Sequence, residues 1–178
     1  MFKKILIIFI SLIILFFAYV VMQPSQIQVE RSVVISSSDV EVYSYINNHL
    51  KWEEWSPWAN LDDNAEKFYG GPLQGVGSYF KWSGNNSIGA GTSTIIENKP
   101  NEYVRFRVDF TKPTKTTSIS EFKITKIEMN KTRVQWNTYS EKSFIAKIFG
   151  VFIDCNEIAG NQIEKGLINL KNLLELRK

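Results

Sequence analysis

An uncharged apolar run near the N-terminus constrains this chain more than any other feature of its sequence. The 18 residues from Ile5 to Met22 contain one serine and no charged side chain. At 1.5 Å per residue, a helix of this length measures about 27 Å, close to the hydrocarbon thickness of a bilayer. Because the run is apolar on every side, it has no face to turn toward water, which argues against a buried core helix. We expect residues 1–22 to form a transmembrane signal-anchor.

A cleaved signal peptide is the competing interpretation of the same run. Such a peptide has a shorter apolar core followed by small residues at the cleavage site, whereas this run ends in the large residues 19–22. Lys3 and Lys4 precede the run, and the next cation is Arg31. The positive-inside bias then predicts a single-pass membrane protein with a cytoplasmic N-terminus and an extracytoplasmic C-terminal domain.

The composition excludes several classes of function. The chain is 44% hydrophobic and 22% charged, so it is not a disordered polypeptide. Its formal charge of +3 falls to +1 without Lys3 and Lys4, so no basic face for nucleic acid is indicated. One histidine and one cysteine are too few for a zinc-type site or an intramolecular disulfide. We expect no metal, no cofactor and no nucleic-acid partner.

The remaining sequence predicts a short polar linker, residues 23–27, and one domain, residues 28–178. Turn residues separate a series of β-rich segments, a spacing that suits an antiparallel meander. Residues 104–110 alternate between apolar and charged side chains, so one face of the sheet is dry and the other is wet. The predicted strands are 28–36, 66–69, 75–82, 89–97, 103–110, 116–127 and 131–139.

Helices are predicted between the first two strands and at the C-terminus. Ser38 and Glu41 form a capping box that starts a short helix, and residues 49–58 form a second one that Pro57 ends. Residues 154–176 carry apolar side chains at steps of three and four, as in a long amphipathic helix. The fold class is therefore α+β: a curved antiparallel sheet of about seven strands gripping one long C-terminal helix, with two short helices and an N-terminal transmembrane helix.

Five short stretches, in this order, resemble the START-like helix-grip superfamily (SRPBCC). They are WSPW at 55–58, GVGSYFKW at 75–82, GAG at 89–91, TRVQW at 132–136 and GLINLK at 166–171. The chain is most similar to the polyketide cyclase/dehydrase-like branch. This resemblance implies a seven-stranded sheet and a hydrophobic cavity under the long helix. It leaves the function open, because these folds include lipid carriers, hormone receptors and cyclases.

Such a cavity predicts membrane-anchored binding of a hydrophobic small molecule or lipid, driven by burial of apolar surface. Plain core packing would explain any one of the same side chains as well. We expect Trp55 and Trp58 at the cavity mouth, although they could equally form a satellite core. The residues expected to line the cavity are Phe80, Trp82, Phe106, Phe110, Phe122, Trp136, Ile163, Leu167 and Leu170.

The sequence indicates no catalytic residues. His49 lies among surface-like residues at the predicted helix junction, and solvation explains the carboxylates of residues 53–63. One alternative is a cyclase- or dehydratase-like enzyme using the same cavity, which would need a buried acid or tyrosine such as Glu54, Asp62 or Tyr69. The other is an interaction module with a filled core. The oligomeric state stays open.

Overall fold

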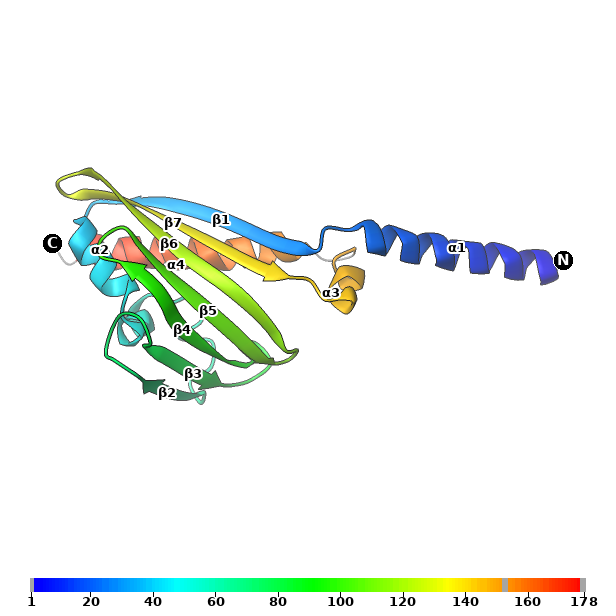
Figure 1. Ribbon diagram of the computed structural model, residues 1–178, viewed down its shortest axis with the longest axis horizontal. Helices are drawn as coiled ribbons and strands as arrows, with labels where there is room; N and C mark the ends of the chain where they lie inside the picture. The colour runs from blue at the N-terminus through cyan, green and yellow to red at the C-terminus, as the bar shows by residue number, and fades with distance from the viewer. Residues whose placement is uncertain (1, 152–153, 177–178) are drawn as a thin grey trace.

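The computed structural model describes residues 2–151 and 154–176, and it confirms the predicted α+β architecture (Figure 1). Seven antiparallel strands form one sheet in the order β1-β7-β6-β5-β4-β3-β2. The strands are β1 (Gln26–Ile35), β2 (Glu66–Gly70), β3 (Tyr79–Ser83), β4 (Ala90–Lys99), β5 (Tyr103–Lys112), β6 (Thr116–Glu128) and β7 (Lys131–Glu141). The helices are α1 (Phe2–Met22), α2 (Asp39–Ile46), the 3-10 helix η1 (His49–Glu54), α3 (Phe144–Phe149) and α4 (Cys155–Leu176).

Capping side chains begin two of the predicted helices, α2 and α4. The Ser38 side chain accepts a hydrogen bond from the Glu41 backbone N–H at 3.2 Å, which satisfies one of the free donors at the start of α2. The Asp154 carboxylate accepts bonds from the N–H groups of Asn156 and Glu157, and so caps α4. The second short helix is a 3-10 helix that ends at Glu54, four residues before the predicted end.

One predicted strand begins later than its sequence pattern indicates. The sequence pattern predicts that this strand begins at residue 75, but β3 begins at Tyr79. Gly75 and Gly77 have φ values of 82° and 87°, in the left-handed region that glycine tolerates, and the Ser78 N–H donates to the Gly75 carbonyl. These residues therefore form a turn that leads into the strand.

α4 covers the concave face of the sheet on its β1 side, and η1 covers the middle of the same face (Figure 1). Gly166 allows α4 to approach closely, because a Cβ there would lie 3.0 Å from both Pro57 Cδ and Trp136 Cζ3. The apolar stripe of α4 faces the sheet as predicted. Its buried members are Ile163, Leu167, Leu170 and Leu174.

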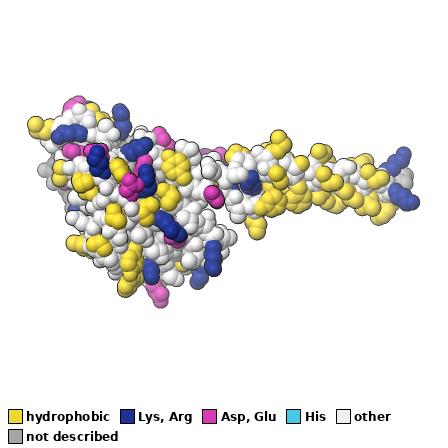
Figure 2. Space-filling view, in the orientation of Figure 1, with side chains coloured by type: hydrophobic (Ala, Val, Ile, Leu, Met, Phe, Trp, Pro, Cys, Tyr) yellow, Lys and Arg dark blue, Asp and Glu magenta, His cyan; other side chains and the backbone are white. Residues whose placement is uncertain are grey.

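α1 extends from the domain as a single long helix (Figure 1), with hydrophobic side chains along its length and the cations of Lys3 and Lys4 near its free end (Figure 2). Within the described residues it is the one helix that is long and apolar enough to cross a membrane. β1 begins at Gln26, two residues before the predicted start of the domain. Only residues 23–25 therefore connect the helix to the sheet.

Candidate functional site

The concave face of the sheet is occupied by aromatic rings. Trp52 packs on Phe106 with ring centroids 4.9 Å apart, and Phe122 packs on Trp136 at 4.4 Å. Trp55 fits edge-on against Trp136 at 6.1 Å. These five rings come from η1, from the residue that follows it and from strands β5, β6 and β7, and together they fill the space between the middle of the sheet and α4.

The nine residues predicted to line a cavity fall into two groups, and the two tryptophans predicted at its mouth are separate from both. Six belong to the packed core and are fully buried, namely Phe106, Phe122, Trp136, Ile163, Leu167 and Leu170. Trp55, expected at a cavity mouth, is instead 1% exposed, because it lies beneath α4 and its carbonyl accepts a bond from the Asn169 side chain. Trp58 is 37% exposed and lies at the border of the cluster.

Phe80, Trp82 and Phe110 form the second group, a half-buried row that continues the core toward one edge of the sheet. Tyr69 stacks on Phe80 at 4.9 Å, Phe80 stacks on Trp82 at 5.8 Å, and Trp82 meets Phe110 edge-on at 5.7 Å. We call these four residues the aromatic row. The Trp82 N–H donates to the Ile88 carbonyl, which fixes the indole on the sheet.

The aromatic row ends at the end of the sheet from which α1 emerges. Ser83 pairs with Ala90, and Ala90 with Lys112, so these residues lie together where β3 and β5 end. β1 starts and β7 ends at this same end of the sheet (Figure 1). The Trp82–Phe110 end of the row therefore lies at the α1 end of the domain.

His49 is placed differently from the sequence expectation. It is 2% exposed, and its ring lies against Trp52, Phe80 and Phe106. Its Nδ1 is 3.2 Å from Ser78 Oγ and its Nε2 is 3.1 Å from Ser93 Oγ, so both ring nitrogens have hydrogen-bond partners. One signal in the sequence could have indicated a polar partner inside the sheet. Ser93 lies two residues before Ile95 on the same strand, so both side chains point to the inward face.

Burial lowers the pKa of His49 from 6.5 to about 4, because no charged group compensates the loss of water around the imidazolium. The ring is therefore neutral at pH 7. A neutral imidazole donates through one nitrogen and accepts through the other, and a serine hydroxyl can take either role. This arrangement makes His49 a polar link between η1 and strand β4 beside the aromatic row.

A carboxylate and a phenol meet at the rim of the aromatic row. The Tyr69 hydroxyl donates to Glu53 Oε1 at 2.5 Å, and Lys67 Nζ donates to Glu53 Oε2 at 2.6 Å. Burial and the neighbouring carboxylate both raise the pKa of Tyr69, so its hydroxyl stays protonated. Asp62 has a structural role, since it accepts the backbone N–H bonds of Asn64 and Asn85.

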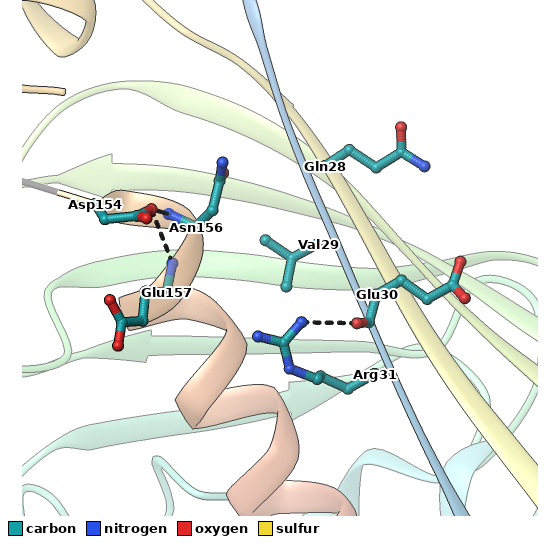
Figure 3. A pocket seen from close by; sticks show the side chains of 7 residues that line it. All are labelled: Gln28, Val29, Glu30, Arg31, Asp154, Asn156 and Glu157. Carbon is teal, nitrogen blue, oxygen red and sulfur yellow. Dashed lines mark hydrogen bonds between the residues drawn. The ribbon is translucent and has the colours of Figure 1, made fainter. Parts of the chain in front are cut away.

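Two hollows described in the structure lie away from these rings. The first, about 310 Å³, lies between β1 and the start of α4 and is lined by Arg31, Asp154 and Glu157 among others (Figure 3). The second, about 450 Å³, lies on the opposite face of the sheet around Tyr103, Arg105 and Glu121. Neither hollow is lined by a residue that was predicted to line a cavity.

Within residues 2–151 and 154–176, no three His, Cys, Asp or Glu side chains are grouped to hold a metal ion.

Comparisons with known proteins show the fold alone. No family model matches the chain, and no curated protein matches its sequence. A structure described as the Aha1 dimer from Colwellia psychrerythraea is 21% identical with a TM-score of 0.59, over 85% of this chain and 98% of that chain. CalU16 from Micromonospora echinospora is 14% identical with a TM-score of 0.56, over 82% of this chain and 73% of its own. A protein of Mesorhizobium loti reaches a TM-score of 0.61 at 14% identity, over 85% of this chain and 98% of its own. These likenesses agree with a helix-grip fold.

Proposed function

We propose that this protein is a single-pass membrane protein whose helix-grip domain binds an apolar small molecule or lipid on the aromatic row. The observation that carries the proposal is that Phe80, Trp82 and Phe110 pack on one another but stay partly exposed, although α4 and η1 bury the rings in the middle of the same face. Half-buried aromatic rings offer apolar contact area that is already ordered. The site lies beside the core, because the space under α4 is filled by side chains.

Desolvation supplies the binding energy in this proposal. An apolar ligand that buries about 300 Å² would gain about 7 kcal/mol at 25 cal/mol per Å², before the cost of lost motion. No charged contact is needed for such a ligand. The position of the row supports a membrane source, because Trp82 and Phe110 lie near the end of the sheet that carries α1.

Photolabelling of the full chain in lipid nanodiscs tests the proposal. With a diazirine-bearing fatty acid in the bilayer, we expect labelled peptides from β3 and β5 in addition to α1. Trp82→Ala should raise the concentration for half-maximal β3 labelling roughly tenfold, which corresponds to about 1.4 kcal/mol of lost contact.

Trp58→Ala is the matched control, because Trp58 is a partly exposed tryptophan outside the row. It should leave β3 labelling unchanged. Labels confined to α1, or equal losses in the two variants, would contradict binding on the row.

The Glu53–Tyr69 pair favours one second candidate, a cyclase- or dehydratase-like enzyme that removes a proton from a ketone held on the row. A carboxylate beside a protonated phenol is a combination used for proton transfer next to a carbonyl. We expect the protein to accelerate exchange of the α-hydrogens of an aromatic ketone in D₂O, followed by NMR, and Glu53→Gln to abolish the acceleration while β3 photolabelling persists. Exchange at the uncatalysed rate would exclude this candidate and leave the binding proposal intact.

A further inference from the structure

α3 presents an unusually apolar surface for a helix of six residues. Phe144 is 49% exposed, Ile145 is 63% exposed and Phe149 is 59% exposed. The Ser143 side chain caps the helix by accepting from the Ala146 N–H at 3.2 Å, so the segment has a defined start directly after β7. These three side chains project from an ordered element and are left uncovered by the domain.

α3 contacts α1 and the link that follows it. Phe144 stacks on Phe17 of α1 with centroids 6.2 Å apart and ring planes 13° from parallel. Lys147 Nζ donates to Ser25 Oγ at 2.9 Å, and the Lys142 N–H donates to the Ser25 carbonyl at 2.8 Å. α3 therefore packs beside α1 (Figure 1), and the exposed apolar side chains of the two helices meet at Phe17 and Phe144.

The position of this contact along α1 sets a depth for α3. Phe17 comes five residues before Met22, the end of α1, which is about 7.5 Å along a helix axis. Helices that lie in a membrane interface bury their apolar face about 5–10 Å into the boundary between headgroups and acyl chains. If α1 spans a bilayer, the stacking of Phe144 on Phe17 places α3 at this depth.

Four lysines lie at the same end of the domain as α3. Lys142 precedes the helix and Lys147 belongs to it, whereas Lys112 ends β5 and Lys115 lies in the turn before β6, which the sheet register brings to this end. Lysines next to a bilayer surface are attracted to anionic headgroups by about 1 kcal/mol each. Apolar side chains pointing into the boundary with lysines beside them match the chemistry of a lipid surface.

We infer that α3 is a second membrane contact: Phe144, Ile145 and Phe149 enter the headgroup–acyl boundary of the bilayer that α1 spans, and hold the domain against its surface. This inference rests on the proposed membrane anchoring. The occupant of the apolar surface is the lipid bilayer, because the contact with α1 fixes its depth. The Trp82–Phe110 end of the aromatic row then lies at the membrane-proximal end of a domain that is docked at two points.

A fluorescent probe at single cysteines of the full chain tests the inference in liposomes of phosphatidylcholine with a minority of phosphatidylglycerol. NBD is attached at Ile145→Cys, Ile10→Cys or Met129→Cys in a Cys155→Ser background. Met129 is the control, because it is 80% exposed in the turn between β6 and β7, at the opposite end of the sheet. Lipids that carry a doxyl quencher either near the headgroup or at the middle of the acyl chain report the depth of each probe.

The expected result is a blue-shifted NBD emission at position 145 that the shallow doxyl quenches more than the deep one. The probe at position 10 should be quenched more by the deep doxyl, and the probe at position 129 by neither. An unquenched probe at 145 with a quenched probe at 10 would overturn the role of α3 and leave the anchor standing. Unquenched probes at both positions would overturn the anchor itself. A blue shift at 145 that grows with protein density and is insensitive to doxyl would show that a second copy covers α3, which also overturns the inference.

Discussion

Lowering the pH from 6.5 to 4 is expected to remove about 3 kcal/mol of unfolding free energy through His49 alone. Burial lowers the pKa of His49 to about 4 in the folded protein, whereas the unfolded chain has a value near 6.5. Between these values the unfolded state binds a proton that the folded state does not. The stabilising contribution is therefore complete above pH 6.5 and is lost as the pH falls through 4.

The measurement is chemical unfolding of the full chain in detergent micelles, followed by tryptophan fluorescence at a series of pH values. His49→Gln is the matched variant, because its amide can still donate to one serine and accept from the other but does not titrate. Carboxylates titrate in both proteins and cancel in the difference between the two curves. The difference should change by about 3 kcal/mol across this pH range. Parallel curves would show that His49 is not held neutral by burial.

Trp136→Ala is expected to cost about 3–5 kcal/mol of unfolding free energy, the range for removing a buried large aromatic side chain. Trp136 contacts Phe122, Trp52, Trp55 and Trp58, so its loss leaves a void in the middle of the ring cluster. Part of the cost is offset, because the Trp136 indole N–H has no acceptor among the described residues and its removal relieves a buried unpaired donor.

Trp58→Ala provides the comparison within the same cluster, because Trp58 contacts Trp136 edge-on but is partly exposed. Its cost should be clearly smaller than that of Trp136→Ala, since 37% of the Trp58 surface stays in contact with water in the folded protein. Urea unfolding of both variants measures the two values. Equal costs would mean that the rings under α4 are loosely packed, and would reopen the prediction of a cavity there.

The order of elements could be predicted because each signal is local. The Ser38–Glu41 capping box, the alternation along 104–110 and the apolar stripe of 154–176 depend on neighbours a few residues away. The glycines at 75 and 77 show the limit of this reasoning. The apolar residues around them fit a strand, but their positive φ values turn the chain.

The contents of the site could not be predicted, because they depend on residues distant in the sequence. His49 follows two asparagines and precedes Leu50 and Lys51, a sequence typical of a surface. Its burial depends on Ser78 and Ser93, which are 29 and 44 residues away. In the same way, the alternation places Phe106 and Trp82 on one face of the sheet. It does not reveal that η1 covers Phe106 completely and leaves Trp82 partly exposed.

The short connection between α1 and β1 limits how far the domain can travel. Residues 23–25 reach at most about 10 Å when extended, and Ser25 is already bonded to Lys142 and Lys147. If α1 spans a bilayer and the domain binds a ligand, as proposed, the domain cannot carry that ligand across an aqueous compartment to a second membrane. Transfer of the ligand would then occur by lateral encounter within one membrane, at a rate set by two-dimensional diffusion and by the abundance of the recipient in the same membrane.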